Sequence, residues 1–280
     1  MTGILNAWYG LLDLLPFEWT NYIFMKNALL AVILVTPILG LLGTMIVNNK
    51  MSFFSDALGH SALTGVGLGV LFGMRNTDIS MVLFAVIFAI GIVYIKHNQK
   101  SAMDTTIGVF SSTAVALGIV LLSGGGFNKY SNLLIGDLLS ITGLEIIMLF
   151  GLLIVVIVAW AMMFNTLLIV SASPTFAKSR GISTQLTDMV FTTLIALVVT
   201  LSIKWVGLLV INSLFILPAA ASRMLSRNMR QYTIISVVIS LVCGVVGLFT
   251  AYYLNTSAGA TIALYCAVVY FIVLVFLKKI

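Results

Sequence analysis

The sequence predicts an all-α integral membrane protein, a polytopic bundle of eight to nine transmembrane helices in contact with membrane lipid. Of its 280 residues, 61% are hydrophobic and only 8% are charged, whereas about 25% of the residues in a soluble domain are charged. Nine apolar segments are each long enough to cross a bilayer as a helix. The net charge of +6 comes from cations at the ends of these segments. It therefore indicates membrane topology and not nucleic-acid binding.

The nine segments are separated by short polar interruptions, and we treat the whole chain, residues 1–280, as one transmembrane domain. The segments are 27–47, 53–73, 79–95, 104–123, 143–169, 186–203, 206–222, 232–253 and 256–277. Only Lys204 and Trp205 separate the sixth segment from the seventh. That spacing is typical of a re-entrant or broken helix, which lowers the expected count from nine to eight. We also expect a short half-helix in the glycine-rich stretch 123–142.

Residues 1–24 precede the first apolar segment and are predicted to lie at the membrane interface. This stretch carries Asp13 and Glu18, lacks a basic start and mixes Trp, Tyr and Phe among apolar residues. A cleaved signal peptide has a different pattern. Aromatic side chains are favoured at the level of the lipid headgroups, which agrees with an interfacial segment.

The positions of Lys and Arg predict the orientation of the chain. With nine spans and an external N-terminus, ten cations are cytoplasmic and four are external. The cytoplasmic set is Lys50, Lys96, Lys100, Lys178, Arg180, Arg223, Arg227, Arg230, Lys278 and Lys279, and the external set is Lys26, Arg75, Lys129 and Lys204. This excess on one side follows the positive-inside rule and predicts a cytoplasmic C-terminus.

The longest polar interruption, residues 170–185, is cytoplasmic in this topology and is predicted to hold a short helix outside the membrane. Ser173 followed by Pro174 is typical of a helix N-cap and the first helical residue. Gly181 is typical of the position just after a helix end. A helix of about two turns is expected between these signals.

The candidate metal ligands are Asp56 and His60, which lie four residues apart in an otherwise apolar segment. On a helix this spacing places both side chains on one face. Ionisable groups inside a membrane cost at least about 2.5–3.5 kcal/mol and are therefore seldom present without a function. A carboxylate beside an imidazole is half of a site for Zn²⁺ or a similar divalent metal. Measured from residue 50, the pair lies about 9–15 Å from the cytoplasmic end of its helix, near mid-membrane.

Other interpretations of this pair remain open at this stage. It could only pack helices together, since membrane helices use such hydrogen bonds, or it could relay protons in a secondary cation transporter. Three further polar residues are candidates for a hydrated pathway: Ser111, Ser112 and Asn212. Pro218 follows Asn212 in the same segment and predicts a kink.

Several motifs are absent, and their absence excludes function classes. The sequence contains no G-x-x-x-x-G-K-[ST], so the chain does not bind ATP through a P-loop. It contains no H-E-x-x-H and no G-x-S-x-G, which argues against a zinc protease or a serine hydrolase and for a protein that is not an enzyme. Cys243 and Cys266 lie in apolar segments without metal-ligand spacing.

Five motifs in order resemble the permease subunits of bacterial ABC importers for zinc, manganese and iron. The first is Lys50-Met-Ser-Phe-Phe-Ser-Asp56-Ala-Leu-Gly-His60-Ser-Ala-Leu-Thr-Gly65. The others are Ala102-Met-Asp-Thr-Thr-Ile-Gly-Val, Gly136-Asp-Leu-Leu-Ser-Ile-Thr, Ser173-Pro-Thr-Phe-Ala-Lys-Ser-Arg-Gly181, and Lys204-Trp-Val-Gly-Leu-Leu-Val with Leu217-Pro-Ala-Ala-Ala-Ser-Arg223. The resemblance covers about residues 25–277.

The resemblance implies a homodimer in the bacterial plasma membrane that works with a cytoplasmic ABC ATPase and an extracellular metal-binding protein. Residues 173–181 would be the coupling helix that docks on the ATPase, with Ser173, Pro174, Ala177 and Gly181 as its characteristic residues. Asp56 and His60 would meet their counterparts from the second copy and form the metal gate, without a permanently bound cofactor.

The sequence around Asp56 resembles the zinc uptake members of the family more than the manganese members, so Zn²⁺ is the expected substrate. The alternatives are Mn²⁺ and Fe²⁺, because mixed Asp and His ligation also suits these metals. Some zinc members carry a His in the fourth helix where this chain has Phe110-Ser-Ser. That departure leaves this chain with fewer nitrogen ligands.

Overall fold

The computed structural model describes residues 2–14, 16–98, 103–123 and 136–277, and all regular structure among them is helical. The helices are α1 (Thr2–Asp13), η1 (Glu18–Asn21), α2 (Ile23–Asn48), α3 (Phe54–Leu71), α4 (Thr77–Asn98), α5 (Met103–Leu122), η2 (Leu138–Ser140), α8 (Gly143–Ala172), α9 (Pro174–Ser179), α10 (Thr184–Val206), α11 (Leu208–Leu225), α12 (Met229–Leu254) and α13 (Ala258–Leu277). The labels η1 and η2 denote short 3₁₀ helices. The predicted all-α fold is therefore confirmed.

Eight of these helices are long and apolar enough to cross a membrane: α2, α4, α5, α8, α10, α11, α12 and α13. This number lies within the predicted range of eight to nine. The segments 186–203 and 206–222, one of which was expected to be re-entrant or broken, both form long helices, and the ninth predicted segment, 53–73, is α3. The remaining long helix, α3, has 18 residues but includes Asp56, His60 and several glycines, which make it less apolar than the other eight. It packs against α4, α5, α10 and α11.

The sixth and seventh predicted segments form two long helices, α10 and α11, joined at Gly207. Gly207 has a φ of 82°, a left-handed conformation that glycine adopts without steric cost. The expected half-helix in 123–142 lies mostly outside the described residues, and the described part contains η2.

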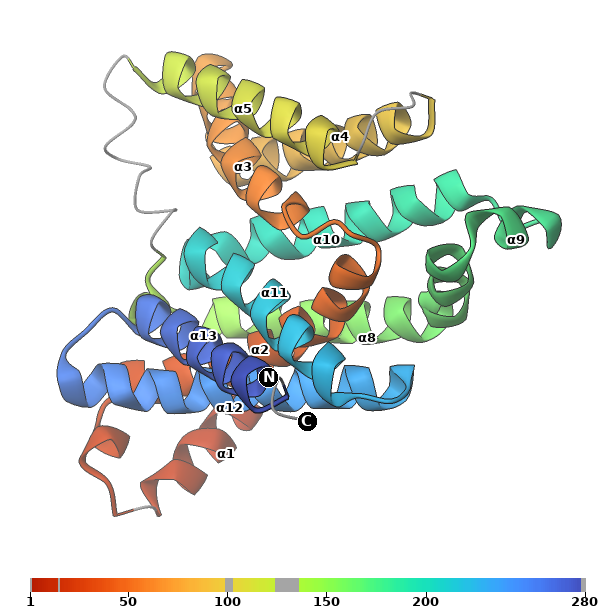
Figure 1. The fold of residues 1–280 in the computed structure, drawn as a ribbon. Coiled ribbons are helices and arrows are strands. Elements are labelled where there is room, and N and C mark those ends of the chain that lie inside the picture. The colour runs from red at the N-terminus through yellow and green to blue at the C-terminus, as the bar shows by residue number, and fades with distance from the viewer. Residues whose placement is uncertain (1, 15, 99–102, 124–135, 278–280) are drawn as a thin grey trace.

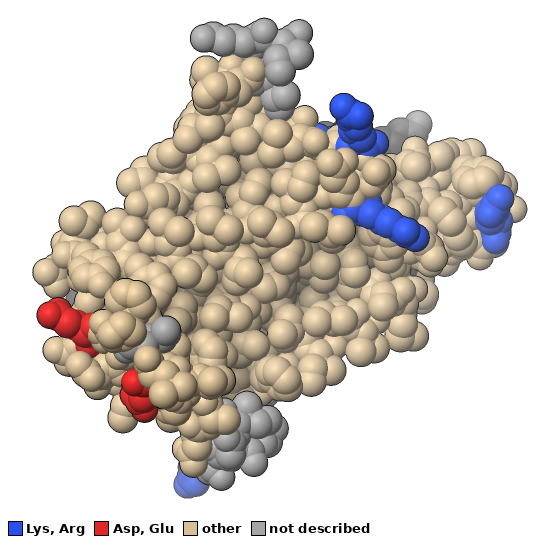
Figure 2. Space-filling model, turned by 90° about the horizontal axis from the view of Figure 1, so that it is seen from below, with Lys and Arg blue, Asp and Glu red and all other residues tan. Residues whose placement is uncertain are grey.

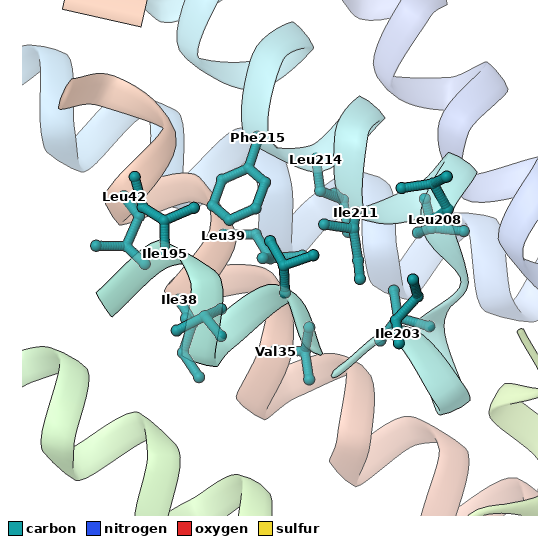
Figure 3. Close-up of a cluster of buried hydrophobic side chains, with 14 of the residues drawn as sticks. Val35, Ile38, Leu39, Leu42, Ile195, Ile203, Leu208, Ile211, Leu214 and Phe215 are labelled. Atoms are coloured by element: carbon teal, nitrogen blue, oxygen red, sulfur yellow. The ribbon is translucent and has the colours of Figure 1, made fainter. Parts of the chain in front are cut away.

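The centre of the bundle is α2, which packs against α8, α11 and α12. Figure 3 shows side chains from α2, α10 and α11 meeting in one apolar cluster, and the labelled residues are all buried. The helices approach closely at Gly43, where a Cβ atom would overlap the carbonyl oxygen of Phe215. Small residues permit such close approach between membrane helices. In Figure 1, α3, α4 and α5 lie on one side of α10, and α2, α12 and α13 lie on the other.

The two ends of the bundle carry different elements. We call the end with α9, at the right of Figure 1, the α9 end, and the opposite end the α1 end. At the α1 end, the indole nitrogen of Trp8 donates to the carbonyl oxygen of Lys26 over 3.1 Å, and the ammonium of Lys26 pairs with Asp13. These contacts hold α1 on the start of α2. Figure 2 shows Asp and Glu at the left end of one face and most of the Lys and Arg toward the right.

Candidate metal site

The candidate ligands occupy the first two turns of α3. This helix begins at Phe54, so Asp56 lies in its first turn and His60 one turn later. The distance between Asp56 Oδ2 and His60 Nε2 is 3.6 Å, and the two side chains are 42% and 31% exposed. The start of α3 agrees with the predicted segment 53–73. Asp56 and His60 lie about 3–9 Å from this start by the helical rise, which is less than the expected 9–15 Å because that distance was measured from residue 50. Residues 49–53 form the turn between α2 and α3, with Lys50 at a φ of 56°.

A third polar residue reaches this pair from α11. The side-chain nitrogen of Asn212 donates a hydrogen bond of 2.7 Å to Asp56 Oδ1. The side-chain oxygen of Asn212 is buried and has no hydrogen-bond partner among the described residues. The two helices meet closely here, because a Cβ atom on Gly59 would overlap the side chain of Leu208. Asp56, His60 and Asn212 thus form one polar group, which we call the α3–α11 site.

The other two pathway candidates do not touch the α3–α11 site. The hydroxyl of Thr64 donates to the carbonyl oxygen of Ala114, which fixes the position of α3 along α5. His60 lies one turn before Thr64 on α3, and Ser111 and Ser112 lie about one turn before Ala114 on α5. The two serines are therefore at about the level of His60. Within the described residues, no hydrogen bond joins either serine to Asp56 or His60. The structure therefore brings together three of the five predicted residues.

One copy of the chain brings together two residues of the kinds that bind metals. The described residues contain no group of three or more His, Cys, Asp and Glu side chains that could hold a metal ion. Structural Zn²⁺ sites use about four ligands, and transport or catalytic sites leave positions open. Asp56 and His60 supply one oxygen and one nitrogen on a partly exposed face, where further ligands can approach from outside the chain.

At the α9 end, the predicted short helix is present as α9. The hydroxyl oxygen of Ser173 accepts from the backbone N–H of Phe176 over 3.3 Å, Pro174 is the first helical residue, and Gly181 has a φ of 74°. Ala177 is fully buried against its own chain, so it anchors α9 and does not face a partner. The exposed residues here include Phe176, which is 49% exposed, and Arg180 just after α9, whose guanidinium lies 4.8 Å from the ring centroid of Phe176.

The sequence did not reveal a second polar group at this end. His97 lies in the last turn of α4, and its Nε2 is 3.0 Å from Asp188 Oδ2. Lys96 Nζ is 2.7 Å from the same oxygen. We call these three residues the α4–α10 ion cluster. The one available signal was an acid, Asp188, inside the apolar segment 186–203.

Comparison with known proteins places this chain among membrane permeases. A family model described as the ABC 3 transport family matches residues 21–277. The high-affinity zinc uptake system membrane protein ZnuB of Haemophilus influenzae is 32% identical, over 90% of this chain and 97% of that protein. The manganese import system permease protein ScaB of Streptococcus gordonii is 29% identical, over 90% of this chain and 91% of that protein.

A solved structure has the same fold. The structure of PsaBC from Streptococcus pneumoniae in complex with Fab matches with a TM-score of 0.78 at 27% sequence identity. The match covers 98% of this chain and 95% of that chain. The helical arrangement described above is therefore shared along nearly the full length of both chains.

Proposed function

Because the chain belongs to the ABC 3 transport family and is the permease subunit of a bacterial metal importer, we propose that its substrate is Zn²⁺. ATP hydrolysis in this family is carried out by a separate partner. The permease itself is a multi-pass protein of the plasma membrane and not an enzyme. The family assignment therefore favours an ATP-driven importer over the alternative of a proton-coupled secondary transporter.

The observation that carries the proposal is the pairing of Asp56 with His60 on a partly exposed face of α3. Zn²⁺ binds His nitrogen and carboxylate oxygen at about 2.0–2.2 Å, which separates two tetrahedral ligand atoms by about 3.4 Å. The observed separation between Asp56 Oδ2 and His60 Nε2 is 3.6 Å. The two atoms are therefore nearly as close together as two ligands of one Zn²⁺ ion. The zinc relative named above supports this choice of metal.

Mn²⁺ is the second candidate, with Fe²⁺ as a further alternative of the same family. The manganese relative covers the same share of this chain as the zinc relative. The carboxylate of Asp56 supplies oxygen to the site, and oxygen ligands suit the harder metal Mn²⁺. His60 supplies the nitrogen that favours Zn²⁺.

A second copy of the chain completes the site in this proposal. An isologous dimer places the same residue of each copy near one axis, so two Asp56 and two His60 side chains would supply four ligands. Their exposed fractions of 42% and 31% leave room for this approach. A passing ion should be held only moderately, because a tight site would stall transport.

The remaining partners follow from the two ends of the bundle. We propose that α9 is the coupling helix that docks on the cytoplasmic ABC ATPase, with Phe176 and Arg180 as contacts. With α3 as the ninth span, the C-terminus is cytoplasmic in this orientation. The α1 end then faces outward and receives the extracellular metal-binding protein. Asp13, the last residue of α1, and Glu18, the first residue of η1, are exposed at this end.

Metal identity is tested by uptake of radiolabelled Zn²⁺, Mn²⁺ and Fe²⁺ in cells that lack their own importers. The cells express the chain together with its ATPase and its binding protein. We expect Zn²⁺ uptake that depends on all three proteins and that excess Mn²⁺ does not abolish. Uptake of Mn²⁺ or Fe²⁺ without Zn²⁺ would refute the zinc assignment and leave the family assignment in place.

A further inference from the structure

The α4–α10 ion cluster is separate from the α3–α11 site and has no role in the function proposed so far. Its centre is the carboxylate of Asp188, whose side chain is only 5% exposed. Lys96 and His97, with side chains 27% and 19% exposed, approach the same carboxylate oxygen. The cluster therefore ties the last turn of α4 to the second turn of α10 through a buried charge.

Stability alone does not account for a buried ion pair. Removing two charges from water costs several kcal/mol per ion, and well-packed apolar residues of similar volume are often at least as stable. Apolar side chains are buried on both helices, among them Ile92 of α4 and Ile195 of α10, and the hydroxyl of the buried Thr192 bonds back to its own helix. An interaction that is directional and specific to one arrangement suits a role in positioning.

The cluster borders the junction between α8 and α9. A cavity of about 190 Å³ is lined by the cluster together with Asn49, Lys50, Ser171 and Pro174. Pro174 is the first residue of α9. On the same wall, the side-chain nitrogen of Asn48 donates to the hydroxyl of Ser171 over 2.7 Å, which ties the end of α2 to the end of α8. Four helix ends and the start of α9 thus share one small polar cavity.

The same cavity leads to α3 through a short connection. Asn49 and Lys50 belong to the turn that joins α2 to α3, and only five residues separate Lys50 from Asp56. The turn is constrained, because the backbone N–H of Met51 donates to the carbonyl oxygen of Ile46 over 3.0 Å and the side chain of Met51 is 1% exposed. The turn therefore forms a short, packed connection between the cavity wall and the first turn of α3.

We propose that Asp188 is a positioning residue that couples movement of α9 to the α3–α11 site. Its ion pairs hold α4 and α10 against the junction of α8 and α9, so that a displacement of α9 moves the turn before α3 as well. Without these pairs, α9 moves while α3 stays. The inference rests on the proposed docking of the ATPase on α9, but not on which metal is carried.

The test uses the complete importer in liposomes, with permease, ATPase and binding protein present. The wild type is first measured with Zn²⁺, Mn²⁺ and Fe²⁺, and each later measurement uses the metal that it carries. The readout is the number of metal ions transported per ATP hydrolysed. Asp188→Asn keeps the side-chain volume and removes the charge. We expect this ratio to fall by roughly 5- to 150-fold, the usual size of a coupling between sites, while ATP hydrolysis continues.

Two matched variants separate coupling from general damage. Asp188→Glu keeps the charge and should restore most of the ratio. Asp78→Asn breaks an exposed ion pair between Asp78 Oδ2 and Lys204 Nζ at 2.8 Å, with side chains 44% and 38% exposed. Because exposed pairs contribute little, this variant should keep the wild-type ratio.

A wild-type ratio in an assembled Asp188→Asn importer would overturn the proposal. If this variant does not assemble with the ATPase, the Lys96→Met variant is measured instead. This change weakens the same cluster and leaves His97 in contact with Asp188. An unchanged ratio in Lys96→Met would then reject the role of the cluster. If the wild type does not carry Zn²⁺, only the proposed substrate is refuted. The coupling test remains valid with the metal that the importer carries.

Discussion

The side-chain nitrogen of Asn212 donates a hydrogen bond of 2.7 Å to Asp56 Oδ1, between residues that lie 156 positions apart in the sequence. This bond fixes one carboxylate oxygen and leaves the other, Oδ2, toward His60 at 3.6 Å. It also joins α3 to α11, so that the candidate ligands cannot move without α11. The orientation of the α3–α11 site is therefore set by a residue that is not itself charged.

Replacing Asn212 with Leu should lower the apparent metal affinity while the protein folds normally. A hydrogen bond to a charged group contributes about 1.5–3 kcal/mol, which corresponds to roughly a 10- to 100-fold rise in the KM for metal. Ser213→Ala is the matched control, because the Ser213 hydroxyl bonds only to its own helix at the carbonyl oxygen of Leu209 over 2.7 Å. Equal KM values for the two variants would argue against a positioning role for Asn212.

Gly43→Ala should destabilise the contact between α2 and α11. A Cβ atom there overlaps the carbonyl oxygen of Phe215, and backbone cannot move aside as a side chain can. Overpacking of this kind costs typically about 1–3 kcal/mol. The check is the Tm of the purified protein in detergent, against Gly151→Ala, where a Cβ atom meets nothing within 4 Å. A Tm as high as that of the control would show that the helices can separate without cost.

Phe176→Ala should weaken binding of the ATPase to the permease. Phe176 is 49% exposed on α9 and lies under the guanidinium of Arg180, an arrangement that suits an aromatic anchor in a partner's groove. Such anchors cost about 2 kcal/mol or more when truncated. The measurement is co-purification of the ATPase with the tagged permease. Ile234→Ala, at a side chain 63% exposed on α12, serves as the control. Undiminished co-purification would move the docking site away from α9.

A reporter protein fused to the C-terminus should give the result expected for a cytoplasmic location. Ten of the fourteen cations favour this orientation. Green fluorescent protein fused after Ile280 is expected to fluoresce, and alkaline phosphatase at the same position is expected to be inactive. The opposite pair of results would invert the bundle and place α9 outside the cell.

Local signals predicted the local structure well. Ser173, Pro174 and Gly181 predicted α9 and its ends, because capping depends on residues only a few positions apart. Composition alone predicted the eight apolar helices. The predicted segment 53–73 also placed the start of α3 within one residue of Phe54.

Contacts between distant segments could not be predicted in the same way. Asn212 was a pathway candidate, but nothing in the sequence pairs it with Asp56. Ala177 appeared in a matching motif, and only the structure shows that it faces its own chain. The partners of Asp188 lie more than ninety positions away, so the α4–α10 ion cluster appears only once the chain is folded.

The central claim is that metal passes through the α3–α11 site, and uptake by a His60→Ala variant tests it most directly. The measurement compares radiolabelled Zn²⁺ and Mn²⁺ uptake with the wild type, at matched expression and with ATPase binding verified. Loss of the metal ligand predicts that uptake of the transported metal is abolished while the complex still assembles. Uptake at the wild-type level by the assembled variant would contradict the claim and place the pathway elsewhere in the bundle.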